Sequence, residues 1–145
     1  MDFDLTFRAA SGRFTTWEES TPAPYVRGSF RLCGAKNVTV TVTGLGFYDL
    51  FINGKRLTKG ICAPYICNPD KEIFFDRYDI SKDVTDGENV IGLILGNGFF
   101  NAWDGFVWDF DKAGYRGAPM TAFVIEADGK PVFSSADRLT VHDSP

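Results

Sequence analysis

The residues of this chain that could do chemistry gather between Leu95 and Pro119. About twenty residues there follow no clear period, and they interleave aromatic rings with amides and carboxylates. Aromatic faces can stack on the C–H faces of sugar rings, while Asn and Asp side chains hydrogen-bond the hydroxyls. The candidate carbohydrate contacts are Asn97, Trp103, Asp104 and Trp108. A second interpretation stays open, in which the rings pack on one another or on a neighbouring domain and bind no sugar.

Catalytic groups are harder to find. The only histidine, His142, lies three residues from the end of the chain, where we expect an exposed position. Glycoside hydrolysis needs two carboxylates on either side of a sugar bond. The chain has 19 acidic residues, but no pattern selects a pair among them. We therefore expect no catalysis by this chain alone and assign no catalytic residue.

Acidic residues in the same stretch raise the question of a metal. Asp104, Asp109 and Asp111 carry the oxygen ligands that calcium prefers. Their spacing does not follow an EF-hand loop, in which acidic ligands alternate before a glycine. No metal ligand is assigned, no cofactor is expected, and calcium is left open.

Composition narrows the class of protein. The 145 residues suit one domain, residues 1–145, and the 44% hydrophobic content provides for a core. The net charge of −4 and the lack of a basic cluster argue against a nucleic-acid partner. No run of 18 apolar residues predicts a membrane span, and the acidic N-terminus does not resemble a signal peptide. Three cysteines, an odd number without zinc-site spacing, indicate reduced thiols and a cytoplasmic protein.

Short apolar runs, separated by turn residues, must position these side chains. Asn53-Gly54 predicts a type I′ hairpin turn, and Asp128-Gly129 predicts a second hairpin. No helical period is found, so we predict an all-β fold: an antiparallel two-sheet sandwich, jelly-roll-like, with residues 1–23 as an N-terminal arm. The run 90–95 is apolar on both faces and should be a central strand. The expected strands are 25–32, 38–43, 46–57 (a hairpin), 72–80, 90–95, 120–135 (a hairpin) and 139–143.

Several of these segments, taken in order, resemble a known family. The stretches are "GLGFYDLFINGKRL", "APYICNPDKEIFFDRYDIS" and "DGENVIGLILGNGFFN". They are similar to the N-terminal β-sandwich domain of bacterial α-L-rhamnosidases. The matching positions are Gly46, Tyr48, Asn53, Gly54, Ala63, Pro64, Tyr78, Asp79, Ile80, Gly87, Asn89, Gly96, Gly98, Phe99 and Phe100.

The resemblance implies a role within a larger protein. In that family the catalytic carboxylates lie on a separate helical barrel, so this chain would be a non-catalytic accessory domain cut from a multidomain glycosidase. The parent would hydrolyse terminal α-L-rhamnose from glycosides, and this domain would brace the barrel or help bind substrate. Two alternatives stay open: an autonomous carbohydrate-binding module for rhamnosyl ligands, and a purely structural packing module. The implied partners are the remaining domains of the parent and rhamnose-containing glycans.

Overall fold

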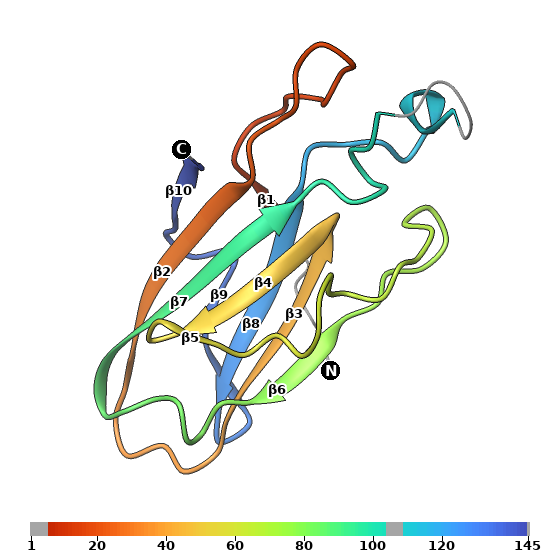
Figure 1. The fold of residues 1–145 in the computed structure, drawn as a ribbon. Coiled ribbons are helices and arrows are strands. Elements are labelled where there is room, and N and C mark those ends of the chain that lie inside the picture. The colour runs from red at the N-terminus through yellow and green to blue at the C-terminus, as the bar shows by residue number, and fades with distance from the viewer. Residues whose placement is uncertain (1–5, 104–108, 145) are drawn as a thin grey trace.

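The computed structural model describes residues 6–103 and 109–144, and they form two antiparallel sheets packed face to face (Figure 1). One sheet has the order β1-β8-β3-β6, with β9 also paired to β8. The other sheet has the order β10-β2-β7-β4-β5. The strands are β1 Arg8–Ala9, β2 Pro24–Leu32, β3 Val38–Leu45, β4 Phe47–Ile52, β5 Lys55–Arg56, β6 Asp76–Asp79, β7 Gly87–Gly96, β8 Met120–Ala127, β9 Lys130–Ser134 and β10 Thr140–Asp143, with one 3₁₀ turn, η1, at Phe110–Lys112.

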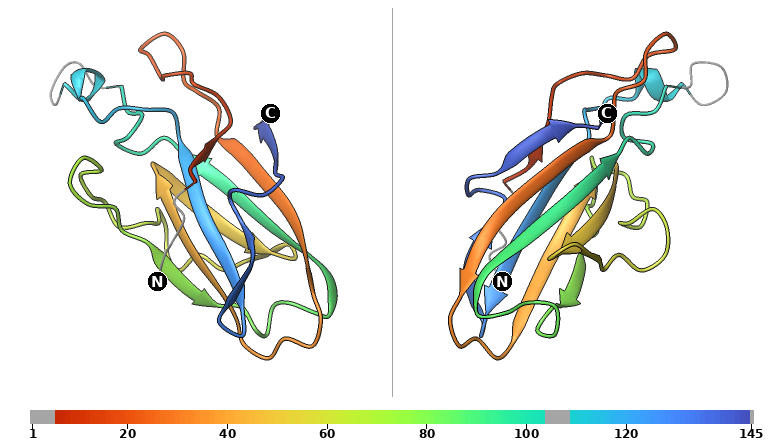
Figure 2. Two further views of the ribbon diagram at one scale, coloured as in Figure 1. Left: turned by 180° about the vertical axis from the view of Figure 1, so that it is seen from behind. Right: turned by 60° about the vertical axis from the view of Figure 1, so that its left-hand side comes forward.

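The path of the chain fits the predicted jelly-roll-like sandwich. When the hairpin partners β5 and β9 are set aside, the successive strands β2, β3, β4, β6, β7 and β8 alternate between the two sheets, so that each connection crosses one end of the sandwich (Figure 2). Strand β7 lies between β2 and β4, which confirms the central strand expected for residues 90–95. Within the described ranges, no helix is long and apolar enough to cross a membrane.

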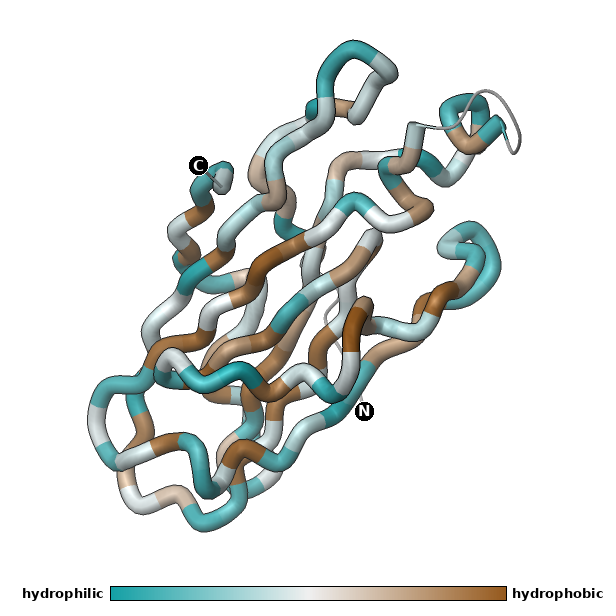
Figure 3. The backbone as a smooth tube through the Cα atoms, in the orientation of Figure 1, coloured by the Kyte–Doolittle hydropathy of each residue, from teal (hydrophilic) through white to brown (hydrophobic). Residues whose placement is uncertain are grey.

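The core is formed by strand residues that alternate between buried and exposed positions. In β2 every second residue is buried, and Ile91, Leu93 and Leu95 of β7 turn inward in the same way. The three phenylalanines Phe30, Phe123 and Phe133 bridge the sheets, with ring centroids 6.0 Å apart in two pairs. Figure 3 shows the hydrophobic residues concentrated along the strands. The outer face of β7 is only partly covered, since Ile94 is 36% exposed.

Both predicted hairpin turns are confirmed by their backbone angles. Asn53 and Gly54 have φ of 50° and 82°, both positive, as a type I′ turn requires. Asp128 and Gly129 have φ of 49° and 80°. No heavy atom lies within 4 Å of the position that a Cβ on Gly54 would take, so only the backbone conformation favours glycine there.

One predicted strand is shorter than expected. Residues 72–80 were expected to be extended, but β6 covers only Asp76–Asp79, which pairs with Thr39–Val42 of β3. Beyond that point the hydroxyl of Thr43 donates to the carbonyl of Phe74 at 2.6 Å. The backbone pairing of β6 with β3 thus gives way to a side-chain bond, and Phe75 is 59% exposed. On β3 the threonines Thr41 and Thr43 are buried as well as the valines of the same strand.

Candidate docking groove

Two long loops project from one end of the sandwich and enclose a groove of about 340 Å³. We call residues 57–75 the Ala-Pro loop and residues 97–119 the aromatic loop, of which the structure describes 97–103 and 109–119. Figure 1 shows the Ala-Pro loop in yellow-green and the aromatic loop in cyan at the same end of the molecule. The described residues that line the groove are Gly44, Leu45, Gly46, Phe47, Pro64, Tyr65, Ile66, Cys67, Asn68, Pro69, Phe99, Phe100, Phe110 and Tyr115.

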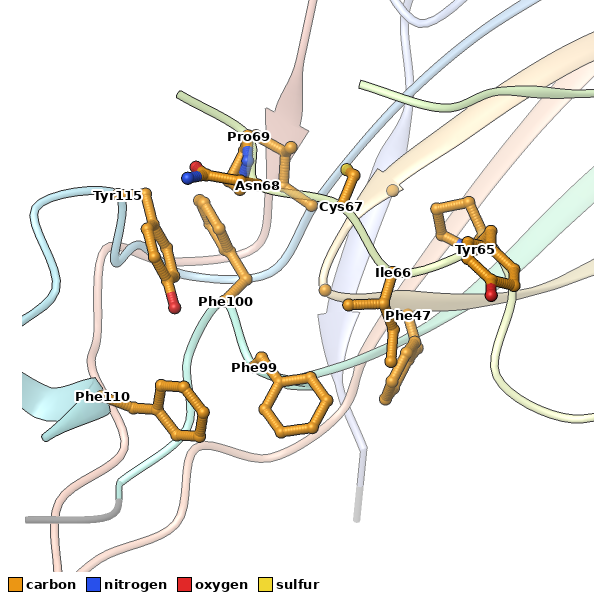
Figure 4. Close-up of a pocket in the computed structure, with 14 residues that line it drawn as sticks. Phe47, Tyr65, Ile66, Cys67, Asn68, Pro69, Phe99, Phe100, Phe110 and Tyr115 are labelled. Carbon is orange, nitrogen blue, oxygen red and sulfur yellow. The ribbon is translucent and has the colours of Figure 1, made fainter. Parts of the chain in front are cut away.

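The groove is apolar and its rings are accessible. Tyr65 is 82% exposed, Ile66 is 56% exposed and Phe99 is 45% exposed. The ring centroids of Phe99 and Phe110 lie 5.1 Å apart, and Figure 4 shows both rings facing the same space. Among the lining side chains only Tyr65, Cys67, Asn68 and Tyr115 carry a polar atom. The surface is therefore suited to apolar and aromatic contact more than to a ligand with many hydroxyls.

The floor of the groove is the connection between β3 and β4. Gly46 has φ of 99°, and a Cβ there would collide with the carbonyl oxygen of Gly96 and lie 3.0 Å from that of Asn97. Glycine is therefore required for the close approach of this connection to the end of β7. The turn places Phe47 in the groove, where it is labelled in Figure 4.

Tyr48, the next residue, anchors the Ala-Pro loop. Its backbone N–H donates to the carbonyl of Ala63 at 2.6 Å. Its hydroxyl donates to the carboxylate of Asp76 and lies 3.2 Å from the hydroxyl of Tyr78. Tyr48 is on β4 and its two partners are on β6, so the cluster joins the two sheets at their open edge. Burial, and then the bond with Asp76, raise the pKa of the Tyr48 hydroxyl far above its ordinary value of 10.0, which keeps it protonated as a donor.

Two of the four predicted carbohydrate contacts, Asn97 and Trp103, lie within the described residues. The side-chain oxygen of Asn97 accepts from the amide of Asn101 at 3.0 Å, and its amide nitrogen donates to the carbonyl of Thr21 at 3.3 Å. Trp103 is half-buried, and neither Asn97 nor Trp103 is among the described lining residues. The candidates Asp104 and Trp108 lie outside the described residues. Their contact with a sugar stays a prediction.

Sequence reasoning missed the Ala-Pro loop as a functional surface. The run "ICAPYIC", residues 61–67, was used only as a family feature, although it places apolar side chains beside proline between two strands. Apolar residues in a loop can indicate a functional surface, because a loop normally lies on the surface of the protein. Ile61 is 88% exposed, and with Tyr65 and Ile66 it extends the apolar surface around the groove.

The histidine and the acidic residues considered for catalysis or metal binding are not among the described residues that line the groove. His142 is exposed on β10, opposite Tyr25 of β2. Asp109 pairs with Lys112 at 2.9 Å, which holds the pKa of the lysine above its ordinary value. The part of the chain that the structure describes contains no group of three side chains suited to a metal ion. All three cysteines are free.

The model of the α-L-rhamnosidase N-terminal domain family matches residues 34–137, well over half of the chain. The chain belongs to this family. An α-L-rhamnosidase of Formosa agariphila is 41% identical over 64 residues, which are 44% of this chain and 7% of that protein. The sandwich is similar to part of the Dictyoglumus thermophilum α-L-rhamnosidase, with a TM-score of 0.77, 23% identity, and coverage of 99% of this chain and 17% of that one.

A further solved relative is the Streptomyces avermitilis α-L-rhamnosidase complexed with L-rhamnose. It superimposes with a TM-score of 0.72 and 25% identity, over 86% of this chain and 12% of that one. The chain thus spans less than a fifth of the length of each of these three relatives.

The family positions of the hairpin region form one hydrogen-bond network. Asn89 is fully buried, and its side-chain oxygen accepts from the Asn53 amide and from the Thr85 N–H, each at 2.9 Å. Its amide nitrogen donates to the carbonyls of Thr85 at 2.7 Å and Gly87 at 3.2 Å. The network fixes the type I′ turn against the start of β7, and so serves the scaffold and not the groove.

Proposed function

We propose that this chain is a non-catalytic accessory domain of an α-L-rhamnosidase, and that its groove receives a surface of another domain of the same polypeptide. The parent hydrolyses terminal α-L-rhamnose from glycosides. One observation carries the proposal: the groove at the end of the sandwich exposes large apolar side chains that the domain itself leaves uncovered.

Exposed apolar area of this kind favours a protein partner. Tyr65, Ile66 and Phe99 lie on two different loops yet converge on one groove, so a single apolar surface can cover all three. Covering such side chains contributes about 25 cal/mol for each Å² of apolar area removed from water. A neighbouring domain of the same chain is the natural partner, because the relatives are five or more times longer than the segment that matches.

Polar groups for a sugar are scarce at this surface. A monosaccharide presents several hydroxyls, each of which needs a partner when it is buried. The amide of Asn97, a predicted sugar contact, and that of Asn101 are bonded to each other and to the N-terminal arm. This supports docking over sugar binding as the main use of the groove.

Association in trans tests the proposal. The chain is mixed with the remainder of the parent rhamnosidase, produced without this domain, and binding is followed by calorimetry. We expect the wild-type chain to bind and Tyr65→Asp to weaken binding by at least about tenfold, since a buried charge without a partner is costly. Val132→Asp, at an apolar residue of β9 that is 42% exposed, is the matched control and should bind normally. Equal binding by Tyr65→Asp would exclude the groove as the docking surface.

A second function, rhamnosyl binding, is favoured by one observation: the rings of Tyr65 and Phe99 are exposed and available for stacking. In this case the aromatic loop contributes Asn97, Trp103, Asp104 and Trp108 as contacts. Titration of the chain with L-rhamnose, with and without calcium, separates the two functions. Saturable shifts in the NMR spectrum, lost in Trp103→Ala, would favour sugar binding. A flat response up to high millimolar sugar would favour docking alone.

A further inference from the structure

We propose that residues 13–21 of the N-terminal arm act as a strap that sets the position of the aromatic loop, with Asn101 and Arg116 as the positioning residues. The strap lies outside residues 34–137, to which the family model matches. In both views of Figure 2 the arm and the aromatic loop project from the same end of the sandwich. This inference rests on the proposed function in one respect: the groove that the strap shapes is the surface proposed for docking.

One residue of the strap bonds to both ends of the aromatic loop. The backbone N–H of Thr15 donates to the side-chain oxygen of Asn101 at 3.1 Å. The backbone carbonyl of Thr15 accepts from the guanidinium of Arg116. Arg116 also donates to the carbonyl of Ala102 at 3.2 Å, and its guanidinium lies 5.1 Å from the ring centroid of Phe14.

A second contact closes the strap. The carbonyl of Thr21 accepts from the amide of Asn97, and the N–H of Thr21 donates to the hydroxyl of Thr15 at 3.1 Å. Thr15 and Thr21 are 9% and 8% exposed, and Asn101 is fully buried. Buried polar groups are costly to leave unpaired, so the loss of one of these bonds should weaken the others.

The positioning residues are chain neighbours of two groove rings. Asn101 follows Phe100, and Arg116 follows Tyr115. The carbonyl of Phe100 accepts from the N–H of Gly117 at 3.1 Å, which ties these two parts of the loop together. A displacement of the strap therefore moves Phe100 and Tyr115, and with them one wall of the groove.

The strap is tested by amide hydrogen exchange of the 145-residue chain, measured in variants that break the contact first from the aromatic loop and then from the strap. Asn101→Ala should speed amide exchange about tenfold in residues 13–21, although they lie at least 80 positions away in sequence, because the Thr15 N–H loses its acceptor. Thr15→Pro, which removes that donor from the other side, should speed exchange in residues 97–103. In both variants the exchange of β3 and β8 should stay at the wild-type rate.

A side-chain change with a matched control completes the test. Arg116→Met should speed exchange in both the strap and residues 114–119, whereas Arg138→Met, at an exposed arginine, should change neither. Exchange that rises only in the segment carrying the substitution would overturn the proposal, as would faster exchange spread over the whole sandwich. None of these measurements involves another domain, so failure of the strap and failure of the proposed docking are distinguishable.

Discussion

Two glycines with positive φ offer a test of how the groove floor is formed. Gly46 and Gly54 have φ of 99° and 82°, but a Cβ on Gly54 meets open space, while one on Gly46 meets the backbone of Gly96 and Asn97. Alanine at either site costs about 1–3 kcal/mol in backbone strain. Overpacking adds about 1–3 kcal/mol at Gly46 alone, because backbone atoms cannot rotate away as a side chain can.

Urea unfolding of Gly46→Ala and Gly54→Ala measures this difference. We expect both variants to be destabilised, with Gly46→Ala the less stable by about 1–3 kcal/mol. If both variants keep the wild-type m-value, the difference in stability does not come from a change in the denatured state. If the two midpoints coincide, the close approach of the β3–β4 connection to β7 does not constrain the fold, and the reasoning about the groove floor is refuted.

Three further predictions concern the buried side chain of Asn89, the hydroxyl of Tyr48 and the expected lack of catalysis by this chain alone. Asn89→Ala should lower the free energy of unfolding by about 3 kcal/mol, because it leaves several buried groups unpaired, and a loss below about 1 kcal/mol in urea unfolding would contradict this. The raised pKa of Tyr48 means that the folded state holds its proton more tightly than the unfolded state does. Its stabilising contribution is therefore present below about pH 10 and lost at higher pH, at up to about 1.4 kcal/mol per pH unit. Unfolding curves between pH 8 and 11 should show the free energy of unfolding decline with pH, and Tyr48→Phe should make this decline less steep. An equally steep decline in the wild-type chain and in Tyr48→Phe would contradict the prediction. The chain alone should give background rates on an aryl α-L-rhamnoside, and turnover that disappears when one of its own carboxylates is mutated would be decisive against a non-catalytic role.

The local pattern of the sequence was enough to predict the scaffold. Alternating apolar residues predicted β2 and β4, a run that is apolar on both faces predicted β7, and the Asn-Gly and Asp-Gly pairs predicted both hairpin turns. The expected strand over residues 72–80 was half wrong. Its apolar residues Phe74 and Phe75 fit a strand by type, but only Asp76–Asp79 pair with β3, and where a partner strand stops cannot be read from a local window of sequence.

The site was only half predictable. The density of rings marked the aromatic loop, but the opposite wall of the groove comes from residues 64–69, about thirty positions earlier. Nothing in the sequence indicates that these segments meet. The direction of the Asn97 amide is also set in part by a group far away in sequence, since it bonds to the backbone of Thr21 as well as to nearby Asn101. Contacts made through a backbone N–H or carbonyl, such as those of Thr15, leave no trace in residue type.

Oxidative footprinting of Tyr65 tests the docking proposal most directly. In the isolated chain the ring is 82% exposed and should be oxidised at a rate close to that of a free tyrosine. In the intact parent rhamnosidase, without any sugar present, we predict that oxidation of Tyr65 falls several-fold, while oxidation of Trp17, 71% exposed on the N-terminal arm, serves as the internal reference. An equal rate for Tyr65 in the isolated chain and the intact parent would contradict the proposal that another domain occupies the groove.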